Sequence, residues 1–530
     1  MRRAVLLTAT LALGVLIALP ATADRDPGVH ALVDARIIPA PGQVIESGTL
    51  VLRHGIIEAV GADVTPPDDA RVWDLEGASL YPGLIESFYP MELPEADKDA
   101  ASPVAHENAL VGPEREMIRH VDASAFSKLR QAGFTTAVFV PRDGLFRGQS
   151  VTVNLGDAPV GEQILVPGTA QNAQFTLNDD GGYPNSLMGA IALFRQTLLD
   201  ARWHRAAHDA YGRNPRQARP VYNAAWHALE GVAHGSAPIV LQSRNPNDAM
   251  RWLKLVDEFD LDAILVGSGK EYRRADLLTT GEQPWIVPVK YPKAPNVDPD
   301  HPEQVDLDKL RHWDRAPDNL GVLLNAGAQV AVTALGLSDA KDVLKNLGRS
   351  IERGLDADQA LASLTTVPAA LWGIDDRAGT LEPGKMANIV ITDGDLFTDS
   401  PKLRALWIDG RYLELKEIKP PEVDPLGTWD IVIDAGDGGM IPVTVTLSGT
   451  VEALTGSAQA MGIDLPFLDA TVSGSAVELS VNSAPIGIPG TTSLTLNIDG
   501  DNCTGDGITP QGPFTLSGNR TSRPDSEVIR

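Results

Sequence analysis

Strand-like and helix-like segments alternate along the middle of this chain, between about Leu80 and Asp375. The strand-like runs are short and aliphatic, and they are separated by segments in which apolar residues recur three or four positions apart. This alternation predicts a parallel α/β domain, and a stretch of this length fits a (β/α) barrel. The predicted strands are 135–140, 238–241, 263–266, 285–289 and 329–333. The predicted helices are 187–211, 248–259, 340–354 and a further one capped by Asp356.

The two flanks of this region indicate a smaller β module. Residues 29–80 contain short apolar runs separated by Gly, Pro and Asp, and His54-Gly55 is the expected hairpin turn. Residues 376–415 have the same strand-rich character. We therefore predict a small β-sandwich built from 29–80 and 376–415, with the (β/α) barrel spanning 81–375 between them.

The composition changes after this region. Residues 416–426 are rich in proline and acidic residues, which is typical of a linker. Residues 427–522 are rich in Gly, Thr, Ser and Val, with apolar and polar positions alternating as in 443–447. This pattern predicts a separate all-β domain resembling an antiparallel barrel.

The first residues have the features of an export signal. Arg2 and Arg3 precede an apolar run over 4–19, and small residues follow up to Ala23. We expect cleavage after Ala23 and a periplasmic or secreted protein. The apolar run is short for a membrane span, and no later stretch reaches the roughly 20 apolar residues that a span needs, so we expect no membrane insertion.

Charge and cysteine content exclude some partners and crosslinks. The formal net charge is −26, and removal of Arg2 and Arg3 with the signal takes it to −28. An acidic surface repels phosphate backbones, so nucleic acid is not expected as a partner. Cys503 is the only cysteine, so a disulfide within one chain is impossible.

Several segments of the region 29–415 carry a more specific likeness. They are SGTLVLRHGIIEAVG (47–61), LYPGLIE (80–86), LRQAGFTT (129–136), ALASLTTVPAA (360–370) and GTLEPGKMANIV (379–390). In order and spacing these segments resemble those of amidohydrolase-superfamily enzymes, in particular the imidazolonepropionase-like group. The resemblance implies a TIM-type barrel flanked by a β-sandwich built from both chain ends.

The resemblance also implies a divalent metal, such as zinc, at the carboxyl ends of the barrel strands. The metal would activate water for attack on an amide or cyclic C–N bond. The family pattern has an acid and then His-x-His in the first strand, histidines after two later strands, and an aspartate after the last. This chain has different residues at the ligand positions after that first acid: Phe88, Pro90, Gln242, Lys270 and, after the last strand, Ala334 or Leu335. We therefore predict that the usual metal site is absent and that no cofactor is bound.

Active sites in such barrels lie at the carboxyl ends of the strands, which gives a set of candidate pocket residues. They are Glu86, Tyr89, Gln242, Lys270 and Glu271. Lys270 and Glu271 have the residue types for acid-base chemistry, although a structural ion pair is the preferred interpretation. No catalytic residue is assigned.

Three other features have competing interpretations. His204 and His208 lie four apart on a predicted helix, as in some zinc sites, but neighbouring arginines favour a solvated helix face. Asp339 is expected to cap a helix rather than act as a base. Residues 146–155 either line the mouth of the barrel or close a hairpin, and the hairpin is preferred.

Two functional hypotheses follow. The first is a degenerate, non-catalytic member that binds a small-molecule ligand or an active homologous amidohydrolase. The second is an active hydrolase of a small amide or cyclic C–N substrate, which uses an unrecognised metal site or a metal-free Lys/Glu mechanism. The first is preferred because the metal supplies the largest part of this chemistry.

Overall fold

The computed structural model describes residues 28–94, 105–178, 180–295, 306–398, 401–415, 421–434, 439–451, 453–488, 490–509 and 512–523. The expected export signal, with its cleavage after Ala23, and part of the expected linker lie outside these residues. The chain divides between Leu415 and Lys416 into two compact units. No helix in the described part of the chain is long and apolar enough to cross a membrane.

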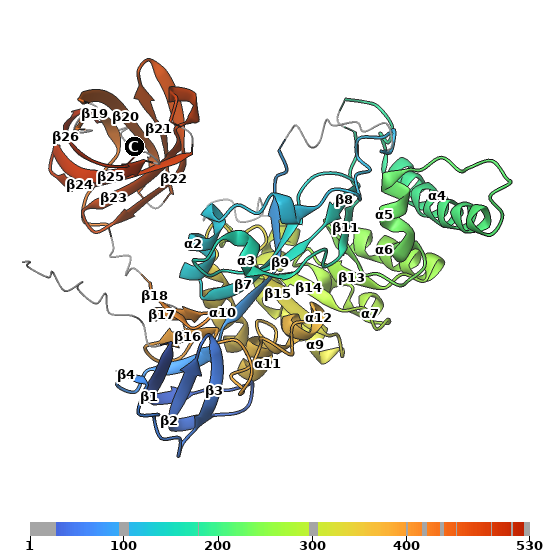
Figure 1. Ribbon diagram of the computed structural model, residues 1–530, viewed down its shortest axis with the longest axis horizontal. Helices are drawn as coiled ribbons and strands as arrows, with labels where there is room; N and C mark the ends of the chain where they lie inside the picture. The colour runs from blue at the N-terminus through green and yellow to red at the C-terminus, as the bar shows by residue number, and fades with distance from the viewer. Residues whose placement is uncertain are drawn as a thin grey trace, which may run out of the picture. The chain divides into compact units, whose positions relative to one another are not determined.

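An eight-stranded sheet joins the two ends of the first unit, and the blue and orange strands lie side by side in Figure 1. The junction is an antiparallel pairing in which Ile389 faces Pro82. His54 and Gly55 form the predicted hairpin turn, with φ angles of 50° and 83°, the sign that a tight two-residue turn requires. The strands are β1 (Val29–Ile37), β2 (Ile45–Arg53), β3 (Ile56–Gly61), β4 (Arg71–Asp74), β5 (Ser79–Pro82), β16 (Ile389–Thr392), β17 (Leu403–Ile408) and β18 (Arg411–Glu414).

The middle of the first unit is a mixed α/β fold whose strands form two sheets. The path β10-β9-β7-β6 makes one sheet, and β15-β14-β13-β12-β11-β8 makes the other. Within these sheets β6 is parallel to β7, and β11 to β15 are parallel to one another. The strands are β6 (Leu84–Met91), β7 (Phe134–Pro141), β8 (Phe146–Gln149), β9 (Val151–Asn154), β10 (Ile164–Val166), β11 (Gln171–Gln174), β12 (Ile239–Gln242), β13 (Ala263–Val266), β14 (Trp285–Pro288) and β15 (Val330–Thr333).

Helices separate most of these parallel strands. The Asn245 side chain caps α6 by accepting the Asp248 N–H, and Asp356 caps α11 in the same way, as predicted. The Asp339 side chain accepts the Lys341 N–H just before α10. The helices are α2 (Ser124–Gln131), α3 (Val160–Gln163), α4 (Leu187–Arg213), α5 (Ala224–Ala233), α6 (Pro246–Phe259), α7 (Ala275–Leu278), α8 (Leu307–Arg315), α9 (Asn319–Asn325), α10 (Asp342–Glu352), α11 (Ala357–Ala362) and α12 (Thr366–Leu371), with 3-10 turns η1 (Met117–Arg119), η2 (Glu271–Arg273) and η4 (Ala316–Asp318).

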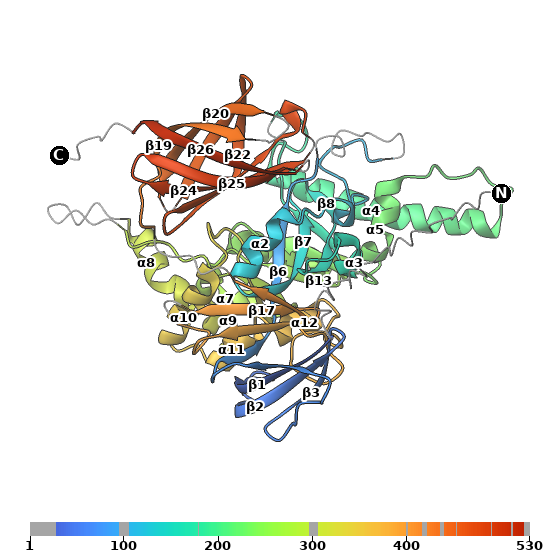
Figure 2. The same ribbon diagram turned by 60° about the vertical axis from the view of Figure 1, so that its left-hand side comes forward.

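The second unit is a closed, eight-stranded antiparallel β-barrel, which confirms the all-β prediction (Figure 2). Inward and outward residues alternate along its strands, so that Val477, Leu479 and Val481 of β23 are buried in the interior. The elements are β19 (Gly427–Asp434), β20 (Met440–Thr450), β21 (Ala453–Ala460), β22 (Ile463–Ser473), β23 (Ala476–Asn482), η6 (Ala484–Ile486), β24 (Thr491–Asp499), β25 (Asn502–Thr509) and β26 (Gly512–Ser522).

Candidate functional site

A pocket of about 1020 Å³ lies at the carboxyl ends of the parallel strands of the first unit. Tyr89 on β6 and Gln242 at the end of β12, both expected at the rim, line it. Gln174 at the end of β11 and the segment that follows β15 complete much of the wall. This is where parallel α/β folds place their ligands, since the loops that follow the strands converge there.

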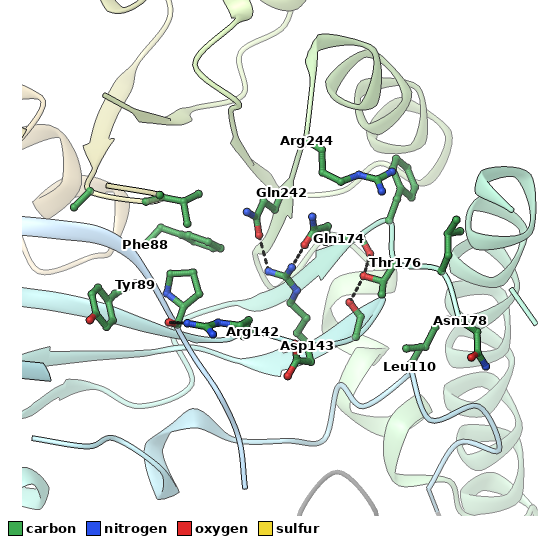
Figure 3. Close-up of a pocket in the computed structure, with 18 of the residues that line it drawn as sticks. Phe88, Tyr89, Leu110, Arg142, Asp143, Gln174, Thr176, Asn178, Gln242 and Arg244 are labelled. Atoms are coloured by element: carbon green, nitrogen blue, oxygen red, sulfur yellow. Dashed lines mark hydrogen bonds between the residues drawn. The ribbon is translucent and has the colours of Figure 1, made fainter. Parts of the chain in front are cut away.

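Arg147 on β8 lines this pocket, and Figure 3 shows the Gln174 and Gln242 side chains that accept its hydrogen bonds. Its side chain donates to Gln242 Oε1 at 2.7 Å and to Gln174 Oε1, so two strand ends hold the guanidinium. Arg147 is only 4% exposed, and its Nε has no hydrogen-bond partner. Within the described residues, no carboxylate lies at ion-pair distance from Arg147.

Burial lowers the pKa of Arg147 to about 10, so the side chain is still a cation at neutral pH. A guanidinium carries five N–H donors, and the two glutamines use only two of them. The pocket therefore contains a positive charge with unused donors.

The topology explains how Arg147 reaches the pocket. β9 pairs with β7 and closes a hairpin, as preferred for residues 146–155. β8 instead pairs with β11 in the other sheet, and this half of the segment lines the mouth. Gly148 has a φ of 114°, and a Cβ there would lie 2.4 Å from the Arg115 carbonyl oxygen. Glycine therefore lets β8 approach the segment before α2 closely.

A smaller pocket of about 340 Å³ adjoins the first and shares Gln242, Arg244 and Leu335 with it. Lys270, Lys290 and His312 also line it, so Lys270 lies at the strand ends as expected. Burial, and then the nearby Lys270 and Arg273, lower the pKa of His312. The two pockets together concentrate positive charge in a chain whose net charge is −26.

Glu86 was expected in the pocket, but it is fully buried and lines neither cavity. Its carboxylate joins β6 to β15 by accepting hydrogen bonds from Thr333 Oγ1 at 2.5 Å, Ala334 N at 2.9 Å and Phe88 N at 3.0 Å. Burial raises the pKa of Glu86 to about 7, although these hydrogen bonds oppose the rise. Glu86 thus connects the two sheets.

Glu271 is also fully buried and outside both pockets, contrary to expectation. Its carboxylate accepts from Ser268 N and Oγ, Gly269 N and Asn319 Nδ2, at 2.5–3.0 Å. Where the structure is described, Lys270 and Glu271 form no ion pair. The preferred interpretation, a structural ion pair, was therefore wrong, because backbone and neutral side-chain groups are the partners of the Glu271 carboxylate.

His204, His227 and Glu230 form a group whose ligand atoms lie within 4.8 Å of one another. His204 is 1% exposed, so a solvated helix face was the wrong prediction for it, because α5 packs against that face of α4. His204 Nδ1 lies 2.7 Å from Glu230 Oε1, and His227 Nδ1 lies 3.4 Å from the same oxygen. Burial raises the pKa of Glu230, but hydrogen bonds from both histidines outweigh it and leave the pKa below its ordinary value.

The hydrogen bonds of this group fix the His204 tautomer. The Asn223 N–H donates to His204 Nε2 at 3.3 Å, so the ring proton lies on Nδ1 and is donated to Glu230. A metal bound at Nδ1 would have to displace that proton, whereas metal-bound histidines usually donate from their other nitrogen. None of the three residues lines the strand-end pockets.

Comparison with known proteins agrees with this architecture. Residues 333–413 match the amidohydrolase family model. The fold is similar to the crystal structure of an amidohydrolase from Thermotoga maritima MSB8, over 73% of this chain and 100% of that chain, with 18% identity and a TM-score of 0.61. Residues 333–413 are therefore similar to part of the amidohydrolase family, and the fold over 73% of the chain is like that of an amidohydrolase.

Two further similarities are shorter or weaker. The urease alpha subunit of Haloquadratum walsbyi is 43% identical over 56 residues, which cover 10% of each chain. A molinate hydrolase structure covers 73% of this chain and 95% of its own, with 14% identity and a TM-score of 0.42.

The superfamily's ligand positions can be compared with the side chains that stand there. Phe88, Pro90, Gln242 and the Ala334-Leu335 segment line the pocket. Hydrocarbon side chains offer no ligand atom, and the Gln242 amide oxygen accepts a hydrogen bond from Arg147. These residues do not fit the histidine and carboxylate set that a zinc-type ion requires.

Arg147 and Gln174 were not among the predicted pocket residues. The signal available was an arginine between an aromatic residue and a glycine, in a segment already considered for the mouth. Its burial depends on the pairing of β8 with β11, which local sequence does not encode.

Proposed function

We propose that this amidohydrolase-superfamily protein binds a small anionic molecule in the strand-end pocket and does not hold the superfamily's divalent metal there. The observation that carries the proposal is the buried Arg147 guanidinium, which Gln174 and Gln242 hold without neutralising it. A buried charge without a counter-ion is costly. A carboxylate, phosphate or sulfonate group would provide the counter-ion and accept the unused N–H donors.

The positive charge of Arg147 also disfavours a metal ion in the strand-end pocket. Two unit charges 4 Å apart interact by about 4 kcal/mol at an effective dielectric constant near 20, so a dication at that distance from Arg147 would be repelled by about 8 kcal/mol. Gln242 Oε1 is 2.7 Å from the guanidinium, so an ion on this oxygen would lie in that range. We therefore propose that the protein is a degenerate, ligand-binding member of the amidohydrolase superfamily.

An active hydrolase of a small amide or cyclic C–N substrate is the competing function. The similarity to the amidohydrolase family favours it, and so does the His204, His227 and Glu230 group as a possible metal site. That group lies on α4 and α5, outside the strand-end pockets, so a metal there would not face the proposed ligand. The metal-free Lys/Glu version is disfavoured, because the Glu271 carboxylate lies outside both pockets and already accepts four hydrogen bonds.

Titration calorimetry with phosphate and with small mono- and dicarboxylates tests the proposal. Arg147→Met should weaken the best anion by more than about tenfold, since hydrogen bonds to charged groups contribute about 1.5–3 kcal/mol. Arg195→Met is the matched control, because Arg195 pairs with Glu258 on the helical surface. Equal affinity in wild type and Arg147→Met, or no anion bound by the wild type, would refute anion binding.

Elemental analysis of protein purified without chelators separates the two functions. We expect no stoichiometric zinc, iron or manganese. About one metal per chain that persists in His204→Leu would place it elsewhere and make the hydrolase the leading function. A metal lost in His204→Leu would assign it to the α4 and α5 group and leave the proposed pocket intact.

We also propose that the protein is exported and that it has a protein partner. The Arg2-Arg3 start and the apolar run after it support delivery to the periplasm or beyond. An active homologous amidohydrolase is the proposed protein partner, and co-purification of the tagged chain from its native cells would test it.

A further inference from the structure

The interior of the C-terminal barrel differs from one end to the other. At the end where β19 begins, the Trp429 indole is fully buried and donates to the Pro425 carbonyl at 2.8 Å. The Arg520 guanidinium lies 4.5 Å from the centre of the Trp429 ring and donates to the carbonyl oxygens of Asp424 and Leu426. Large side chains and a hydrogen-bonded segment therefore fill this end.

The opposite end contains a cavity of about 560 Å³. It lies among the ends of strands joined by the β19–β20, β21–β22, β23–β24 and β25–β26 connections. Ala458 and Ala460 face inward from β21, so small side chains stand where larger ones would fill the barrel. Val481, Leu494 and Phe514 form other parts of the wall.

The wall of this cavity is apolar. No charged residue of the described part of the barrel lines it. The hydroxyls that do line it are used within the protein: Thr492 donates to Ser483 at 3.0 Å, Ser483 to the Gly490 carbonyl at 2.8 Å and Thr509 to the Gly512 carbonyl at 3.1 Å. The cavity therefore has no requirement for a polar ligand group.

One of the described residues at the mouth has an exposed apolar side chain. Met461 lines the cavity and is 69% exposed, so an adaptable apolar side chain stands at the entrance. Eight-stranded barrels have an interior just wide enough to be filled by side chains or to hold one small ligand. A volume of 560 Å³ lies within the roughly 300–1,000 Å³ of small-molecule pockets.

We propose that the C-terminal barrel binds one uncharged, largely hydrocarbon molecule, such as a single acyl or isoprenoid chain, at this open end. The hydrocarbon enters past Met461 and packs between Ala458, Val481 and Phe514. The Trp429 and Arg520 plug limits its depth. Burial of apolar surface drives binding, at about 25 cal/mol per Å² removed from water. This activity is independent of the proposed anion site.

Nile red fluorescence on the full chain tests the proposal, with dodecanol as the competing hydrocarbon. The wild type should bind the dye saturably, and dodecanol should displace it. Ala458→Phe places a ring in the cavity and should weaken binding by at least about tenfold, which corresponds to 1.4 kcal/mol. Gln459→Phe is the matched control, because Gln459 is the exposed, outward neighbour on the same strand.

Thermal melts of each variant establish that the barrel is folded. If Ala458→Phe does not fold, the smaller change Ala460→Leu, nearer the mouth, replaces it with the same expected loss. A wild type that binds no dye, or a folded cavity variant that binds as the wild type does, overturns the proposal. Arg147→Met should bind the dye normally; loss of binding there would place the dye in the strand-end pocket and also overturn it.

Discussion

Glu86 gives a prediction in which a single buried carboxyl makes stability depend on pH. Its oxygens accept from Thr333, Ala334 and Phe88, and burial raises its pKa from 4.5 to about 7. Thr333 Oγ1 also lies 3.0 Å from the Phe88 carbonyl oxygen. The hydroxyl can therefore donate to the ionised carboxylate, or turn to Phe88 and accept the proton of the neutral carboxyl. Both protonation states fit the same heavy-atom positions.

The raised pKa of Glu86 determines the direction and the size of the change in stability with pH. The folded protein binds the proton more tightly than the unfolded chain, so the contribution is fully present below pH 4.5 and is lost as the pH rises to about 7. The full loss is about 3 kcal/mol, since one pKa unit corresponds to 1.36 kcal/mol. About 2.5 kcal/mol of it falls between pH 5 and pH 8.

Urea unfolding at a series of pH values measures this contribution. The free energy of unfolding of Glu86→Gln, subtracted from that of the wild type, should fall by about 2.5 kcal/mol from pH 5 to pH 8. Glu352→Gln changes an exposed glutamate on α10 and provides the matched control. Glu86→Gln also carries a pH-independent cost, because its NH₂ group faces a backbone donor. If the wild type and Glu86→Gln have parallel pH profiles, Glu86 does not titrate as a buried bridge between β6 and β15.

Three further substitutions test the packing. His204→Leu removes the donor to Glu230 and should cost about 2–3 kcal/mol, seen as faster hydrogen exchange in α4 and α5; unchanged exchange would contradict the contact. Trp252→Ala removes an indole whose ring centre lies 3.6 Å from that of Phe175. It should lower the free energy of unfolding of the first unit by about 3–5 kcal/mol. Arg520→Met should lower the free energy of unfolding of the C-terminal barrel alone by about 2–3 kcal/mol, measured as a lower urea midpoint; an unchanged midpoint would show that Arg520 does not stabilise this end of the barrel.

Periodicity predicted the elements well because it reports local burial. The segment predicted as strand 263–266 is β13 at the same residues, and the helix predicted over 187–211 is α4, Leu187–Arg213. The alternating positions after 427 became the closed C-terminal barrel. What periodicity could not give is pairing between distant strands. The ring of strands expected for a TIM-type barrel is hydrogen-bonded as two sheets, and the β-sandwich expected beside it is a single eight-stranded sheet.

The candidate site was harder to predict, for a related reason. Tyr89, Gln242 and Lys270 were predicted from the ends of the parallel strands, which meet at one edge, and these three residues line the two pockets. The position of a strand end does not show whether a carboxylate turns outward to the pocket or inward to backbone donors, and Glu86 and Glu271 both turn inward. These orientations depend on tertiary hydrogen bonds, which the sequence pattern does not contain.

The buried acid and the pocket-lining apolar residues of β6 have different physical roles. The resemblance described above implies an acid followed by His-x-His there, and the sequence has Glu86, then Phe88 and Pro90. The Glu86 carboxylate joins β6 to the end of β15, so its loss would remove these hydrogen bonds between the two sheets. Phe88 and Pro90 line the pocket, and Phe88 also packs in a buried apolar cluster. Arg147 then keeps a positive charge in the pocket, but a guanidinium has no coordination site for water. It can hold an anion, and it cannot generate a hydroxide nucleophile as a Lewis-acid metal does.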